Sequence, residues 1–167
     1  MIKVLLVVFL VSTISCFAQN KAEREFADSI AGVQLKELKD GLLLVRLRSN
    51  KPKIDALQRR GDSVAVKETK REIRLKHLEI VNAFKMNYKY SGVLFFYSHD
   101  SKSVKKSEFE GVLMDDSLNI VDTIPEKYLV CDPYIIEFES MGTTQSGLSI
   151  LGHDLQQLKK PFPYSVR

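Results

Sequence analysis

The sequence predicts an α/β domain, and three features carry that prediction: two apolar runs and the long charged stretch between them. Leu42–Leu47 and residues 93–97 are almost continuously apolar, which is typical of strands covered on both faces. The residues between them are mostly helix formers. Two such strands joined by a helical crossover make a parallel β-α-β unit, which we place at the centre of the fold.

The chain begins with the pattern of an export signal. Residues 4–11 form an apolar run after a positive charge, and small residues precede a cleavage point after Ala18. The run is too short to span a bilayer, which needs about 20 residues. We expect residues 1–18 to be removed and residues 19–167 to form one exported domain, periplasmic or associated with the outer envelope. The alternative is a lipoprotein tethered through an acylated Cys16.

Cleavage would leave Cys131 as the single thiol of the mature chain, so no internal disulfide is expected. A small buried apolar role for Cys131, an intermolecular disulfide and a nucleophile are the three alternatives. Residues 20–40 are polar with loosely spaced apolar positions and predict either a short helix or an edge strand. No later segment is long and apolar enough to cross a membrane.

The crossover should be a broken helix. An unbroken helix over residues 53–88 would run roughly 50 Å, against about 17–20 Å for a short strand. Gly61 suits a helix C-terminus and Asp62 an N-cap, so the break is predicted there. In the second helix, one predicted face lies on the sheet and consists of Val66, Ile73, Ile80, Val81, Phe84 and Tyr88.

The outer faces of this helix are rich in charge. The basic residues are Lys67, Lys70, Arg71, Arg74 and Lys76. Glu68 and Glu72 are interleaved at pairing distances, so we expect a solvated helical surface. A weak peripheral membrane contact through Lys67, Lys70, Arg71 and Arg74 is the alternative. Export makes nucleic acid an unexpected partner.

The C-terminal half predicts antiparallel hairpins. Residues 111–114 and 118–121 flank an Asp-Asp-Ser turn, and residues 134–139 pair with residues 148–151 after a loop of small residues. A short basic helix over residues 102–109 precedes them.

Two His-Asp dipeptides follow predicted strands, and they supply the candidate chemistry. The candidate catalytic residues are His99, Asp100, His153 and Asp115. If the two strand ends converged, imidazoles and carboxylates could hold a divalent metal, or one His-Asp pair could act as a general base. Adjacent residues of an extended chain point to opposite sides, so ordinary turn use of these residues is the alternative. The distance between His99 and His153 discriminates the two readings.

Other chemistry lacks a signature. The sequence has no glycine-rich phosphate loop, no Gly-x-Ser-x-Gly elbow, no paired cysteines and no His-Glu-x-x-His motif. No cofactor and no resident metal are therefore predicted. His77, between Ile73 and Ile80 on the inner helical face, is expected to be a hydrogen-bonded residue at the core edge.

Three stretches resemble a group of small exported proteins of Gram-negative bacteria that have no assigned function. They are residues 82–85 (Asn-Ala-Phe-Lys), 95–98 (Phe-Phe-Tyr-Ser) and 160–164 (Lys-Pro-Phe-Pro-Tyr), and the resemblance extends from about Leu38 to the end. It implies an exported α/β domain and transfers no catalytic residue. We expect a non-enzymatic cell-envelope module that binds another envelope protein or a surface component. The alternative is a small hydrolase or metal-dependent enzyme using His99 and Asp100 with His153.

Overall fold

The computed structural model describes residues 25–128, 131–140 and 146–158. The predicted export signal, including Cys16, and the proline-rich end of the chain lie outside these residues. No helix in the described ranges has the length and apolar character needed to cross a membrane.

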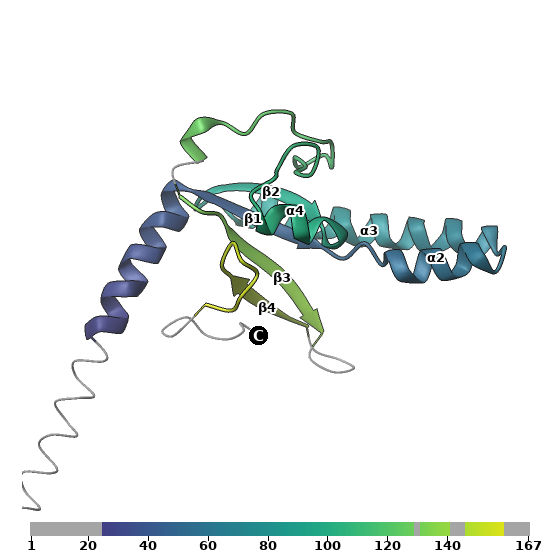
Figure 1. Cartoon of the computed structure of the whole chain (residues 1–167), viewed down its shortest axis with the longest axis horizontal. Coiled ribbons are helices and arrows are strands. Elements are labelled where there is room, and N and C mark those ends of the chain that lie inside the picture. The colour runs from purple at the N-terminus through teal and green to yellow at the C-terminus, as the bar shows by residue number, and fades with distance from the viewer. Residues whose placement is uncertain (1–24, 129–130, 141–145, 159–167) are drawn as a thin grey trace, which may run out of the picture.

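A four-stranded mixed sheet forms the centre of the molecule (Figure 1). The inner strand β1 (Leu42–Leu47) runs parallel to β2 (Gly92–Tyr97) on one side and to β3 (Tyr134–Ser140) on the other. The edge strand β4 (Ser146–Leu151) pairs antiparallel with β3. The strand order is therefore β2-β1-β3-β4, and the predicted α/β class with its parallel β-α-β unit is confirmed.

The crossover helix breaks where the sequence predicts. The first helix, α2 (Lys51–Arg59), is followed by Gly61 with a φ of 72°, a left-handed conformation that glycine adopts without strain. The second helix, α3 (Ser63–Asn87), begins at Asp62, whose carboxylate accepts the Ala65 N–H at 2.9 Å. These two local signals turn one long helical segment into an antiparallel pair.

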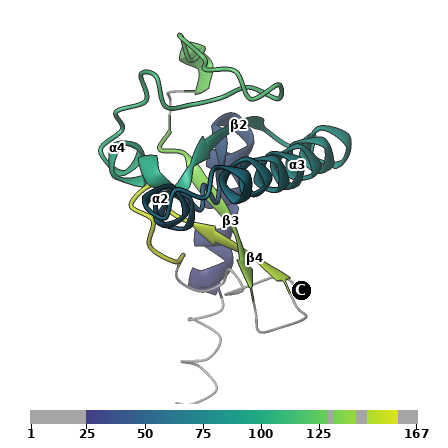
Figure 2. The ribbon, with the colours of Figure 1, turned by 90° about the vertical axis from the view of Figure 1, so that its right-hand side faces the viewer.

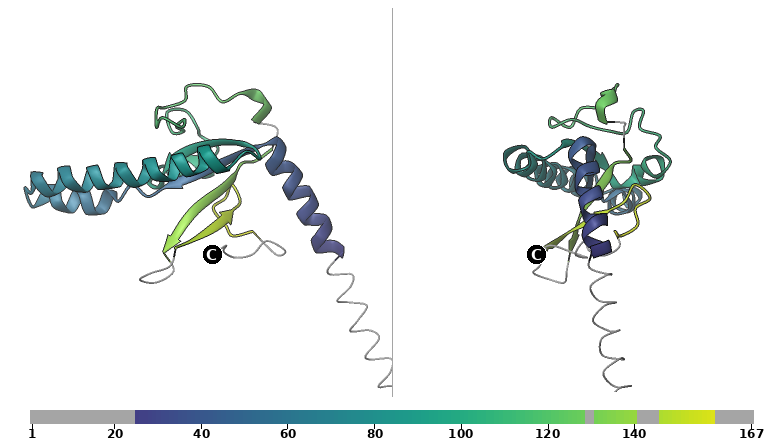
Figure 3. Two further views of the ribbon diagram at one scale, coloured as in Figure 1. Left: turned by 180° about the vertical axis from the view of Figure 1, so that it is seen from behind. Right: turned by 90° about the vertical axis from the view of Figure 1, so that its left-hand side faces the viewer.

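Only the second half of α3 covers the sheet. A helix of 25 residues is about 37 Å long, whereas a strand of six residues covers about 20 Å. Val81 and Phe84 pack on the sheet, while the first half of α3 projects beyond it beside α2 (Figure 3). The prediction that Val66 and Ile73 also lie on the sheet is wrong, because the helix overhangs it and they lie in the arm formed with α2.

The opposite face of the sheet is covered by short helices and irregular chain. A 3₁₀ turn, η1 (Ser98–Asp100), leads into α4 (Ser101–Lys105), and Val104 packs against Leu44. Figure 2 shows α3 and α4 on opposite sides of the strands. The chain then returns to the beginning of the sheet, where a second 3₁₀ turn, η2 (Glu126–Tyr128), precedes β3.

The hairpin predicted around the Asp-Asp-Ser turn does not form two strands. Met114 makes single antiparallel bridges to Phe95 and to Ile120. Asp115 closes the turn by accepting N–H groups from Ser117 and Asn119 at 2.8 and 2.9 Å. Leu118 adopts a φ of 62°, a left-handed conformation that a strand excludes. The turn is present, but this backbone conformation interrupts its second arm.

Residues 25–40 are helical, which settles the alternative between helix and edge strand. Leu38 packs beside Tyr134, and the Tyr134 hydroxyl donates to the Glu37 carboxylate at 2.8 Å. Tyr90 donates to the Leu35 carbonyl oxygen at 3.1 Å. The helix is therefore attached to the sheet by its last turns, and its beginning points away from the body (Figure 1).

Candidate functional site

The dipeptide His99-Asp100 lies at the carboxyl end of β2, where α/β proteins commonly bind ligands. The His99 ring stacks on Tyr97 with centroids 5.5 Å apart and planes at 11°. Its Nε2 atom is 3.5 Å from Asp100 Oδ2. The expectation that neighbouring side chains diverge fails here, because these residues form a 3₁₀ turn rather than an extended chain.

His153 and Asp115 do not join that pair. Because β4 is antiparallel to β3, its end and His153 lie at the amino edge of the parallel strands, whereas His99 lies at the carboxyl edge. His153 Nδ1 is instead 3.4 Å from Asp132 Oδ2. The shared site of two histidines therefore does not form.

The Asp115 carboxylate accepts two backbone N–H hydrogen bonds within its own turn, and these hydrogen bonds lower the pKa of the carboxyl group. Lys85, which pairs with Asp116 at 2.7 Å, contributes in the same direction. Within the described ranges, no three His, Cys, Asp or Glu side chains are grouped so that they could hold a metal ion.

A polar network that the sequence did not reveal joins the carboxyl ends of the strands. Arg46 of β1 forms an ion pair with Glu137, its register partner on β3. Arg46 Nε also donates to Ser101 Oγ at 3.1 Å, and Ser101 Oγ donates to the Ser98 carbonyl oxygen at 2.7 Å. Charged side chains in strands are usually paired when half-buried, so a lone arginine in an apolar run was the available signal.

The first connection of the crossover is held in the same place. Ser49 donates its backbone N–H to Ser98 Oγ at 3.1 Å, and the two hydroxyls lie 3.2 Å apart. Asn50 follows with a φ of 48°, a left-handed conformation that asparagine tolerates, and it begins α2. After β1 the chain turns toward β2 on one side, whereas after β3 it turns toward β4 on the other side. The two connections therefore diverge between β1 and β3, at the position of Arg46 and Glu137.

Two adjoining cavities open at this edge and share Ser49; together we call them the carboxyl-edge cleft. One, of about 270 Å³, lies between the strand ends and the start of α2. The other, of about 330 Å³, lies between the α2-α3 arm and β2. The lining of the cleft includes the side chains of Arg46, Arg48, Ile54, Lys70, Ile73, Arg74, Tyr97, His99 and Glu137.

His77 forms the wall of the second cavity. Its ring is buried, its centroid lies 5.5 Å from that of Tyr97, and its Nε2 atom lies 3.0 Å from the Arg48 carbonyl oxygen. This agrees with the prediction of a hydrogen-bonded histidine at the core edge. Burial lowers the pKa of His77, and the hydrogen bond to Arg48 opposes the shift only in part.

Because the pKa of His77 is lowered in the folded state, we expect the free energy of unfolding to fall as the solution becomes mildly acidic. Above the ordinary value of 6.5, His77 is neutral in both states and its contribution is complete. As pH falls below that value, the unfolded chain gains a proton before the folded state does, so stability declines until the lowered folded-state pKa is passed. In urea titrations from pH 7.5 to 5, His77→Gln should remove this part of the decline. Parallel curves for the wild type and His77→Gln would contradict the assignment.

A further cavity, of about 560 Å³, lies at the other edge of the sheet. Its lining includes Cys131, which is half-buried and forms no disulfide among the described residues. Comparisons with models of protein families, with curated proteins and with solved structures find no match. The resemblance to small exported proteins therefore stays a prediction.

Proposed function

We propose that the protein is an exported, non-enzymatic module of the cell envelope and that its carboxyl-edge cleft binds an acidic segment of another envelope protein. One observation carries the proposal: four basic side chains line the cleft against a single carboxylate, Glu137. The four are Arg46, Arg48, Lys70 and Arg74.

Most of that positive charge is available to a partner. Glu137 pairs with Arg46, but Arg48, Lys70 and Arg74 have no ion pair among the described residues. Ligand carboxylates would meet three cations arranged around a concave surface, where the surrounding low-dielectric wall strengthens attraction. The rest of the arm is more balanced, since Arg71 pairs with Glu68 at 2.8 Å.

The cleft also offers apolar and aromatic contact. Ile54 and Ile73 line the cavity beside α3, and the stacked rings of Tyr97 and His99 line it as well. A free inorganic anion would leave these surfaces unused. A peptide in which acidic residues alternate with an aromatic or aliphatic residue would contact both parts, so this is the chemistry we assign to the partner.

A hydrolase using His99 and Asp100 is the second candidate. The observation in its favour is the 3.5 Å approach of His99 Nε2 to Asp100 Oδ2 at the rim of the cleft. Such a pair can orient an imidazole so that Nδ1 takes a proton from water. This candidate no longer includes His153 or Asp115.

Charge reversal on one helix tests the proposal. The probe is a fluorescent peptide of alternating glutamate and tyrosine, and binding is followed by fluorescence anisotropy. Lys70→Glu/Arg74→Glu should weaken binding about tenfold or more, because two attractions become repulsions. The matched control Lys67→Glu/Arg71→Glu makes the same charge change on α3 outside the cleft and should change affinity less than about twofold.

The other readings are outcomes of the same experiment. Vesicles containing anionic lipid replace the peptide in a second arm; vesicle binding that both double variants weaken equally and that salt abolishes would favour the peripheral membrane contact and contradict the cleft. Equal peptide binding by wild type and Lys70→Glu/Arg74→Glu would also contradict it. His99→Ala should leave peptide affinity within a few-fold, and a hydrolytic activity lost in that variant would favour the enzyme. Crosslinking in cells then identifies the natural partner of the wild type.

A further inference from the structure

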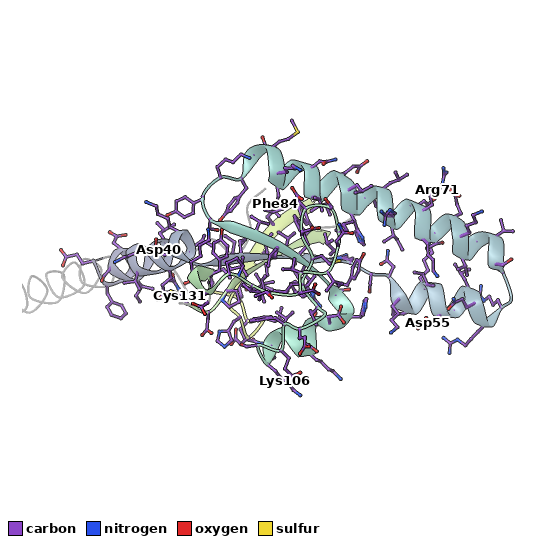
Figure 4. The ribbon with its side chains drawn as sticks, turned by 90° about the horizontal axis from the view of Figure 1, so that it is seen from above. Asp40, Asp55, Arg71, Phe84, Lys106 and Cys131 are labelled. Carbon is purple, nitrogen blue, oxygen red and sulfur yellow. The ribbon has the colours of Figure 1, made fainter. Side chains whose placement is uncertain are left out.

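The cavity of about 560 Å³ is built where the parallel strands begin, and we call it the amino-edge cavity. Leu42, the first residue of β1, and Pro133, just before β3, are buried residues of its lining. Tyr128 forms one wall and packs so closely on Gly92 that a side chain there would overlap the tyrosine ring. In Figure 4, Cys131 marks this end of the sheet, near Asp40 and away from the α2-α3 arm.

The chain that returns from α4 supplies the other wall. Phe109 and Ile124 pack against the core and also line the cavity, and Val121 lies beside them. Their side chains give the interior an apolar surface. A cavity of this volume falls within the range of sites that hold small organic ligands, about 300–1,000 Å³.

Every charged residue of its described lining is acidic. Glu110, Asp122 and Asp132 are exposed, and no lysine or arginine is among the lining residues that the structure describes. Asp132 lies beside His153, whereas Glu110 and Asp122 have no ion pair in the described part of the chain. This concentration of negative charge stands out on a chain with a net charge of +4.

The aromatic wall already meets a positive group of the chain itself. The Lys127 ammonium lies 4.6 Å from the centroid of the Tyr128 ring, although Lys127 is not part of the lining. Cations are attracted to the face of such a ring by its quadrupole. Because Lys127 occupies that face, the apolar walls and the exposed carboxylates are the features that favour a ligand with an apolar body and a positive group.

We infer that the amino-edge cavity binds an apolar organic cation: an ammonium or guanidinium group carried on an aromatic or aliphatic body. The body enters between Leu42, Phe109 and Ile124, and the charge stays at the rim beside Glu110 and Asp122. This site is separate from the carboxyl-edge cleft, at the opposite edge of the sheet, and takes ligands of the opposite charge. A test of this site therefore gives a result that does not depend on the proposed function.

Three probes with one apolar body test the inference on the exported protein: 4-phenylbutylamine, 4-phenylbutanol and 4-phenylbutyrate. Affinity is measured by calorimetry, and occupancy by the rate at which iodoacetamide alkylates Cys131, followed on its peptide by mass spectrometry. The amine should bind and slow alkylation several-fold, the alcohol should bind more weakly, and the acid should neither bind nor protect. Equal affinity for all three probes, or no protection of Cys131 by the amine, would overturn the inference.

A double variant separates charge from shape. Glu110→Gln/Asp122→Asn should lower the affinity for the amine roughly fivefold, as expected for two exposed charge contacts, and leave the affinity for the alcohol unchanged. The control Glu72→Gln/Glu79→Gln removes the same charge from the exposed surface of α3 and should alter neither. If both variants lower the affinity for the amine equally, the amine is attracted by the net charge of the whole protein, and the proposed site is rejected. Acetyl-Phe-Lys-amide, as a further probe, distinguishes a protein segment that binds from a free amine.

Discussion

Leu44→Ala is expected to lower the free energy of unfolding by about 2–5 kcal/mol. Leu44 lies in the middle of β1, with β2 and β3 on either side, and its side chain is 0% exposed. It belongs to a buried cluster that also contains Phe96, Val104 and Ile135, residues from three other elements. Truncation removes contacts with all of them and leaves a cavity that the surrounding strands cannot fill by moving.

Urea denaturation followed by circular dichroism measures this loss. The matched control is Leu75→Ala on α3, because Leu75 is 52% exposed and the same atoms are removed from the surface. We expect it to change stability by no more than about 0.5 kcal/mol. Similar losses at the two positions would show that the sheet with β1 at its centre is not the stabilising core.

The order of the first two parallel strands could be predicted because its signals are local. The apolar runs identify β1 and β2, and their continuous apolar character indicates burial on both faces. Gly61 and Asp62 predict the helix break through backbone conformation and capping, which depend on neighbouring residues only. The pairing of β3 with β4 follows for the same reason, since a hairpin joins strands that are close in sequence.

The placement of β3 and the site depend on contacts that no local pattern carries. β3 alternates along its length, as an antiparallel edge strand does, yet it also runs parallel to β1 in the interior of the sheet. This register brings Glu137 to Arg46 across 91 residues of sequence. The separation of His99 from His153 has the same origin, because the antiparallel direction of β4 sends its end to the opposite edge.

The extent of α3 on the sheet also depended on tertiary structure. Helical periodicity identified an apolar face over its whole length, but periodicity does not say which part of that face meets strands and which meets another helix. The strands end after six residues, so the first half of α3 packs beside α2 instead. This overhang creates the cavity between Ile54, Ile73 and Tyr97.

Glu137→Ala is expected to destabilise the protein by about 1–3 kcal/mol, because it leaves the Arg46 guanidinium half-buried with Ser101 as its one remaining hydrogen-bond partner among the described residues. The side chains of the pair are 29% and 19% exposed, so the loss is smaller than for a fully buried ion pair. The control Glu68→Ala breaks the exposed pair with Arg71 and should produce no measurable loss. Urea denaturation of both variants provides the comparison.

Replacing both partners tests whether the loss arises from the uncompensated charge. Arg46→Met/Glu137→Leu should restore stability to within about 1 kcal/mol of the wild type, since neither apolar side chain leaves a charge unpaired. The same single variant, Glu137→Ala, should bind the glutamate-tyrosine peptide more tightly, because Arg46 is freed at the carboxyl-edge cleft. Weaker stability together with tighter binding is the combination that a purely structural ion pair does not produce. A Glu137→Ala protein that loses stability but binds the peptide no better would place Arg46 outside the binding surface.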